Sequence, residues 1–170
     1  MSTEPVDEET FPGLPAPPPE DAPVEIRLLR YPLRLGQRAT EHYDEIFREF
    51  ALLAGDQPSH QEGVPARLLA LVDALGRRYA PQQEHEQARE AALSRGEQEG
   101  DFTITVPASA ADASEVLGRM LDETDEFCRD GALLTLAAPD DVAAFRRWYL
   151  SQVIGQVAGR PAQPWPGGLD

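Results

Sequence analysis

His42 and Glu45 stand three residues apart in a segment whose apolar periodicity predicts a helix. Residues at this spacing share one helix face, and His–Glu pairs of this kind bind metal ions in some helical bundles. Such a site needs further ligands, and the two other histidines, His60 and His85, lie in polar segments. We therefore interpret His42 and Glu45 as surface neighbours and predict no metal site, with a small metal-dependent enzyme built around this pair as an alternative.

A second group of ionisable residues, Asp122, Glu123, Asp125 and Glu126, forms an acidic cluster near the single cysteine, Cys128. Paired carboxylates can perform acid–base chemistry when one is buried and the other is solvated. Consecutive residues point in different directions around a helix, so we expect this cluster to be a solvated face that could meet a partner. Cys128 ends an apolar helical face, which favours a buried structural thiol over a reactive one.

The most suggestive cluster for binding is Arg146, Arg147 and Trp148, joined by Trp165 from a proline-rich segment. Tryptophan and arginine are enriched at binding hot spots, so these four residues are our protein-binding candidates. We expect Trp148 at the flank of its helix and both arginines pointing outward. Alternatively, Trp148 covers a sheet edge and the arginines pair with nearby acids. Trp165 either folds back on the domain or docks into a partner.

Composition excludes several functions. The chain of 170 residues has a net charge of −15, no lysine and no asparagine. A phosphate-loop lysine and a Schiff-base site are therefore absent, and no Gly-x-Ser-x-Gly, Gly-rich phosphate loop or Cys-x-x-Cys motif occurs. We predict no catalytic residue and no cofactor. The acidic charge argues against nucleic-acid or anionic-membrane partners and favours a basic protein surface. No signal-peptide pattern or membrane-length apolar run occurs, which predicts a cytoplasmic protein.

Residue patterns also predict the elements that must position these side chains. Alternation of apolar and polar residues predicts strands at 24–32 and 101–107, each ended by a proline. The apolar run 132–137 predicts a third, buried strand, and its place after a helix implies a parallel crossover. Apolar residues three and four apart predict four helices, and the polar segment 82–99 predicts a surface helix. These helices span residues 35–55, 64–78, 82–99, 109–130 and 139–158.

Within the last two helices we expect apolar side chains to face the core. The expected inward residues are Val116, Leu117, Met120, Leu121, Phe127, Cys128, Val142, Phe145, Tyr149, Val153 and Ile154. The predicted fold is a two-layer α+β domain over residues 24–158, with a small mixed sheet of about three strands under four to five helices. Residues 1–23 predict a disordered acidic, proline-rich tail, and residues 159–170 a Pro/Gly-rich C-terminal tail.

Two segments carry a resemblance to a known group of proteins: EHYDEIFREFALLA (41–54) and LLTLAAPDDVAAFRRWYLSQVIGQ (133–156). Over residues 24–160 the chain resembles a group of uncharacterised small proteins of high-G+C bacteria, which in turn resemble accessory members of anti-sigma-factor, partner-switching modules. These modules pair a serine-kinase anti-sigma factor with a PP2C-type phosphatase and an antagonist. The kinase's metal-binding asparagine and the antagonist's Asp-Ser-Ser-Gly loop are missing here, and the single dipeptide Asp130-Gly131 does not make the phosphatase's set of metal-binding Asp-Gly motifs. The resemblance therefore implies a partner or modulator of such a circuit.

The sequence therefore predicts a non-catalytic protein-binding regulator, in a stress-response or sigma-factor signalling circuit, that needs no cofactor. A degenerate nucleotide-binding domain related to the anti-sigma serine kinases is the first alternative. The small metal-dependent enzyme is the second.

Overall fold

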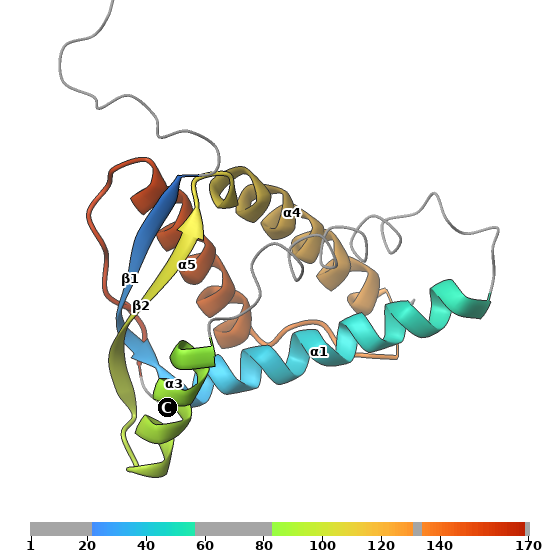
Figure 1. Cartoon of the computed structure of the whole chain (residues 1–170). Helices are drawn as coiled ribbons and strands as arrows, with labels where there is room; N and C mark the ends of the chain where they lie inside the picture. Colours follow the sequence, from blue (N-terminus) through green and yellow to red (C-terminus); the bar gives the residue numbers. More distant parts are fainter. Residues whose placement is uncertain (1–21, 57–82, 131–133, 169–170) are drawn as a thin grey trace, which may run out of the picture.

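The computed structural model describes residues 22–56, 83–130 and 134–168, and these ranges form an α+β fold. Its elements, in chain order, are strand β1 (Pro23–Pro32), helix α1 (Leu33–Asp56), helix α3 (Gln83–Ser94), strand β2 (Glu99–Pro107), helix α4 (Ala110–Arg129) and helix α5 (Asp140–Val157). The expected tail 1–23, apart from its last two residues, and the expected helix 64–78 lie outside the described residues. Figure 1 shows the two strands at one end of the molecule, with α1 extending away from them.

The strands β1 and β2 form a two-stranded antiparallel sheet. Ile26 lies opposite Ile104 and Leu28 opposite Phe102, so the apolar side chains of both strands share one face. The register shifts between Leu28 and Tyr31. At this bulge Arg30 has a positive φ of 52°, and its N–H donates to the Asp101 carboxylate at 2.8 Å.

The expected third strand is wrong over the described part of its range, and with it the expected mixed sheet and parallel crossover. Residues 134–138 form no strand, and Leu134 and Leu136 are 94% and 81% exposed. A short run of apolar residues has the same composition whether it forms a buried strand or an exposed loop, so the residue pattern alone assigned the wrong secondary structure to this segment. The described sheet therefore has two strands.

The core lies between the apolar face of the sheet and helices α1 and α5. Tyr31 is at its centre, with edge-to-face ring contacts to Phe102 at 5.6 Å and to Phe145 at 5.3 Å between centroids. Burial raises the pKa of Tyr31, so its hydroxyl stays neutral. A second small cluster, Ile46 with Leu121, joins α1 to α4.

Most of the apolar helical residues that were expected to face the core are buried or half-buried. Leu121, Cys128, Val142, Phe145 and Val153 are buried, and Leu117, Met120, Tyr149 and Ile154 are half-buried. Val116 and Phe127 are corrections, because they are 37% and 42% exposed. The polar segment 82–99 contains α3 as a surface helix. It packs against the sheet through Ala92, which is buried, and Leu93, which is half-buried.

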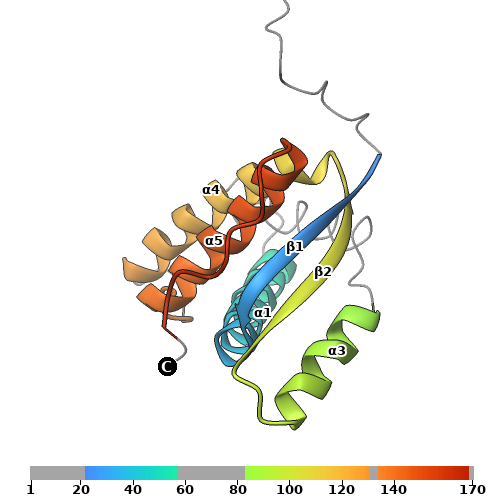
Figure 2. The same ribbon diagram turned by 90° about the vertical axis from the view of Figure 1, so that its left-hand side faces the viewer.

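The C-terminal residues 160–168 pack back on the domain, beyond the expected boundary at residue 158. The backbone N–H of Trp165 donates to the Leu29 carbonyl oxygen at 2.9 Å, so this segment lies along β1. Figure 2 shows it descending beside α5 and β1, on the side of the sheet away from β2. Among the described helices, none is long and apolar enough to cross a membrane.

Candidate functional site

The four protein-binding candidates do not share one surface. Arg147 is exposed, as expected, but Arg146 is 5% exposed and Trp148 and Trp165 are also buried. The expected outward orientation of Arg146 and the flanking position of Trp148 are therefore wrong. In this conformation three of the four side chains are not available to a partner's surface.

Trp148 and Trp165 belong to the core instead. Their rings meet edge to face with centroids 5.6 Å apart, and Trp165 also contacts the Phe145 ring at 5.9 Å. The Trp148 Nε1–H donates to the carbonyl oxygen of Gln163 at 3.1 Å, which satisfies the indole inside the fold. Of the two expected alternatives for Trp165, folding back on the domain is confirmed.

Arg146 is the centre of a buried polar network between α1, α4 and α5. Its guanidinium donates to the Asp125 carboxylate at 3.0 Å, to the Tyr43 hydroxyl oxygen at 2.9 Å and to the Asp122 carboxylate. Asp125 is 2% exposed, whereas the side chain of Asp122 is 59% exposed. Burial raises the pKa of Tyr43 to about 12, against the opposing effect of Arg146, so Tyr43 stays a neutral acceptor. The expectation that the acidic cluster is a solvated face is thus wrong for Asp125.

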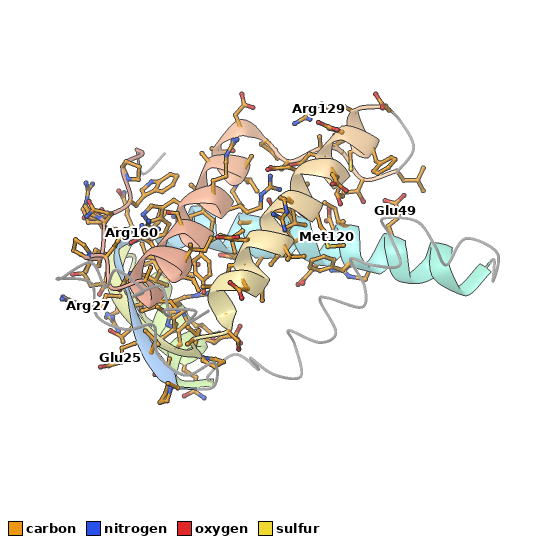
Figure 3. The ribbon with its side chains drawn as sticks, turned by 90° about the horizontal axis from the view of Figure 1, so that it is seen from above. Glu25, Arg27, Glu49, Met120, Arg129 and Arg160 are labelled. Atoms are coloured by element: carbon orange, nitrogen blue, oxygen red, sulfur yellow. The ribbon has the colours of Figure 1, made fainter. Side chains whose placement is uncertain are left out.

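Asp125 connects this network to residues 134–138, which we call the presented loop. One of its carboxylate oxygens pairs with Arg146, and the other accepts the Ala138 backbone N–H at 2.8 Å. Glu49 of α1 holds the other end of the presented loop. Its carboxylate accepts the backbone N–H of Leu134, and the N–H and hydroxyl of Thr135 at 2.8 and 2.7 Å. Figure 3 shows Glu49 projecting from α1.

Two carboxylates thus fix the backbone of the presented loop, and its leucines point outward. Leu134 and Leu136 are the most exposed large apolar residues in the part of the chain that the structure describes, and Phe127 at the end of α4 is next. Thr135, between the leucines, is turned toward Glu49. A loop held at both ends keeps its side chains in place at little further entropic cost, which is the condition for a preorganised binding surface.

Electrostatics supports the anchoring. Partial desolvation alone would raise the pKa of Glu49, but the hydrogen bonds from Thr135 and Leu134 outweigh it and hold the pKa below its ordinary value of 4.5. Glu49 is therefore ionised at neutral pH. The end of α4 that leads toward the presented loop exposes three acidic residues, Glu123, Glu126 and Asp130, and one basic residue, Arg129, so this end carries net negative charge.

The remaining candidates show little chemistry. His42 is half-buried against Tyr43, and its buried Nε2 has no hydrogen-bond partner within the described ranges. Burial lowers the pKa of His42. Among the described residues no three His, Cys, Asp or Glu side chains come together as a metal site, and His60 lies outside them. Cys128 is a buried free thiol, as expected, and desolvation raises its pKa.

A cleft of about 420 Å³ opens between α1 and α3. It is lined by Leu33, Gln37, Glu86, Arg89, Glu90, Leu93 and Ser94. The Arg89 guanidinium lies over the Tyr31 ring at 5.6 Å, and Glu86 and Glu90 flank it on the same helix. Two glutamates beside one arginine leave this cleft poorly suited to a triphosphate, which needs an excess of positive charge.

Sequence reasoning missed Asp125, Arg146 and Glu49 as structural anchors, although two of them carry a signal. Asp125 follows Leu121 by four residues and precedes Cys128 by three, which places it on the apolar stripe of its helix. Arg146 follows Val142 by four residues and lies on the stripe of the other helix. Opposite charges on two apolar stripes predict a buried pair. No local pattern marks Glu49, because its partners are 85 and 86 residues away.

Comparison with known proteins found no match: no family model, no curated protein and no solved structure resembles this chain significantly.

Proposed function

We propose that this chain is a non-catalytic protein-binding domain that offers the presented loop to a partner protein. The observation that carries the proposal is the double anchoring of this loop by Glu49 and Asp125, with Leu134 and Leu136 left outside. Exposed leucines cost solubility, and a chain can hide them by letting a loop collapse onto its surface. Here hydrogen bonds to both ends hold the leucines away from the surface.

The chemistry of the loop defines the partner's surface. Two leucines require an apolar pocket or groove, and Glu123, Glu126 and Asp130 require basic residues at its border. The net charge of −15 adds a long-range attraction to such a partner. The same charges make the expected binding weaker at high salt.

We extend this proposal to a cytoplasmic stress-response or sigma-factor circuit, on the resemblance of residues 41–54 and 133–156 to accessory members of anti-sigma modules. The presented loop falls within the second of these segments. In this reading the chain modulates a component of the circuit by occupying its surface. Arg147, exposed on α5, remains a further candidate contact.

The test places a photo-crosslinking amino acid at position 136 in the native cell and, as a matched control, at position 116 on α4, whose valine is also partly exposed. Position 136 should give a crosslinked protein that position 116 does not give. With that protein purified, Leu134→Ser with Leu136→Ser should weaken binding by at least about 30-fold, because hot-spot side chains contribute about 2 kcal/mol or more. Val116→Ser should leave the affinity unchanged.

Glu49→Gln separates presentation of the loop from its contact chemistry. It leaves both leucines in place but removes the charge that accepts three hydrogen bonds. We expect an intermediate loss of affinity, about three- to tenfold, from the cost of ordering a released loop. Equal crosslinking at positions 116 and 136, or unchanged affinity in the double serine variant, would refute the proposal.

The nucleotide-binding alternative has its own measurement. Calorimetry with ATP and Mg²⁺ should show no heat of binding if the α1–α3 cleft is as unsuitable for phosphates as Glu86 and Glu90 indicate. Micromolar affinity that Arg89→Ala abolishes would favour the degenerate kinase-like domain over the proposed function.

A further inference from the structure

The two edges of the sheet are treated differently by the rest of the chain. The outer edge of β1 is covered: the Gln156 side-chain amide donates to the Arg27 carbonyl oxygen and accepts the Arg27 N–H, both at 2.9 Å. The backbone N–H of Trp165 donates to the carbonyl oxygen of Leu29, two residues further along the same edge. An amide side chain and a C-terminal segment thus take the place of a neighbouring strand along β1.

The outer edge of β2 has no such cover among the residues that the structure describes. Because the backbone groups of Arg27 point away from β2, Arg27 and the opposite Thr103 form a non-hydrogen-bonded pair of the ladder. The N–H and C=O of Thr103, and by the same alternation those of Thr105, therefore point outward on the far side of β2. Figure 2 shows β2 as the strand on the side of the sheet away from α5.

Edge strands are normally blunted by charge, proline, bulges or covering segments, because an open edge is a template for another strand. The stretch of β2 from Phe102 to Val106 has no charge and no proline, and its bulge lies at the other end, opposite Arg30. Helix α3 contacts this strand through the rings of His85 and Phe102, but no described hydrogen bond from α3 reaches the outer edge. Phe102, Ile104 and Val106 are only half-buried by the helices. A two-stranded sheet is also marginal by itself, and it gains stability from added strands.

We infer that the β2 edge pairs with the same edge of a second copy of this chain, giving a continuous four-stranded antiparallel sheet across a twofold axis. With Ile104 on the axis, Thr103 of each copy lies opposite Thr105 of the other. The outward N–H and C=O groups of both threonines then exchange four hydrogen bonds.

The sequence of β2 is self-complementary in this register. Phe102 lies opposite the partner's Val106 and Ile104 opposite the partner's Ile104, so the half-buried apolar face continues from one copy into the next. Asp101 lies opposite the partner's Pro107, which has no charge and needs no hydrogen-bond acceptor. No like charges meet directly, although the chain as a whole carries −15.

This net charge gives the dimer a characteristic salt dependence. Two copies repel each other at long range, so added salt should strengthen the pairing. Binding of a basic partner at the presented loop should weaken with salt, as argued above. The edge interface is small beside the roughly 1,200–2,000 Å² of stable complexes, so we expect a reversible dimer at high micromolar concentration.

The test measures molar mass by sedimentation equilibrium from about 10 μM to about 1 mM, on either side of the expected association. The first variant, Thr103→Glu with Thr105→Arg, places opposite charges across the proposed interface. Within each copy the new residues also face Arg27 and Glu25, respectively, with opposite charge. Figure 3 labels Glu25 and Arg27 on the outer side of the molecule. The matched variant, Thr103→Glu with Thr105→Glu, opposes like charges across the interface but keeps one favourable pair inside each copy.

We expect wild type to approach the dimer mass, twice the 18.7 kDa of the chain, as concentration rises. The opposite-charge variant should dimerise at least as well, and the like-charge variant should need at least about tenfold higher concentration. Circular dichroism melts report whether both variants stay folded. A wild type that remains monomeric at 1 mM, or two variants with the same association, would overturn the inference, and neither outcome bears on the presented loop.

Discussion

The buried pair of Arg146 and Asp125 makes the sharpest prediction for stability. The side chains of Arg146 and Asp125 are 4% and 3% exposed, and Asp125 depends on Arg146 for compensation of its charge, whereas Arg146 also pairs with the exposed Asp122. Arg146→Met keeps most of the side-chain volume between α1, α4 and α5 but removes the positive charge. Arg147→Met is the matched control, because it makes the same chemical change at the next residue, which is exposed.

The expected loss in the free energy of unfolding follows from the groups that Arg146→Met leaves without a partner. With Arg146 removed, Asp125 stays buried with only the Ala138 N–H as donor, and Tyr43 loses its partner. Leaving one member of a buried ion pair uncompensated costs about 3–5 kcal/mol, whereas exposed substitutions stay within about 0.5 kcal/mol. A domain has a total stability of roughly 5–15 kcal/mol, so Arg146→Met removes a large share of it.

Urea unfolding followed by tryptophan fluorescence measures this loss, because Trp148 and Trp165 are both buried and report directly on the core. For a denaturant slope near ~2 kcal/mol/M, the midpoint should fall by about 1.5–2.5 M in Arg146→Met. The midpoint of Arg147→Met should barely move. Adding Asp125→Leu to Arg146→Met removes the orphaned charge and should recover at least about half of the lost stability.

Two results would refute this reasoning. If Arg146→Met costs no more than Arg147→Met, the guanidinium is not buried as described. If the double variant is less stable than Arg146→Met alone, the loss comes from packing and not from the uncompensated carboxylate of Asp125.

Three further predictions concern other parts of the chain. The pKa of Glu49 is lowered in the folded state, so the stabilisation of the presented loop is complete above pH 4.5 and is lost as the pH falls through the folded pKa. In wild type, hydrogen exchange of the Leu134 and Thr135 amides should therefore accelerate as the pH falls through that pKa. In Glu49→Gln their exchange should follow only the intrinsic dependence of the exchange rate on pH. A Cβ at Gly36 would overlap the Tyr31 ring, so Gly36→Ala should destabilise the fold by about 1–3 kcal/mol. A Cβ at Gly118 would make only an ordinary contact with Leu150, so Gly118→Ala should stabilise the helix by about 0.5–1 kcal/mol. Equal melting temperatures of the two variants would contradict this prediction. Cys128 is buried with a raised pKa, so a thiol reagent should modify it at least about a hundredfold more slowly in native protein than in urea, and rapid native labelling would show that the thiol is accessible.

Both strands and the helices α1 and α4 could be predicted from the sequence because each has a strong local pattern of apolar residues. Alternation in β1 and β2 gave their bounds to within two residues, and Pro32 and Pro107 end them as expected. In α5 the contrast between the faces is weak, because the buried residues from Val142 to Gly155 include the polar Arg146 and Gln152. These patterns arise from burial of one face against a common core, so they survive in the sequence whatever the rest of the fold does.

The site could not be predicted in the same way, because its contacts are long-range and polar. The run around Leu134 and Leu136 has the composition of a buried strand, and only the carboxylates of Glu49 and Asp125 decide that it is held outside. Arg146 was expected to point outward because Phe145 and Tyr149 were expected to face the core. The alternative, that it pairs with nearby acids, is confirmed for this arginine. Its partners are on two other helices, 21 and 103 residues away. The apolar stripes of the last two helices carry a signal for the pair with Asp125, whereas no local pattern marks the contact with Tyr43.

The buried ion pair is itself an argument for the presented loop. An apolar pair of similar volume would hold α4 and α5 together equally well, so stability alone does not explain why the charges are there. Such a pair would leave the Ala138 N–H without the acceptor that it finds in Asp125. The distinctive consequence of the charged pair is therefore the position of the presented loop. The double variant Arg146→Met with Asp125→Leu should recover stability but still lose binding through Leu134 and Leu136. A double variant that recovers both would separate the ion pair from the proposed function.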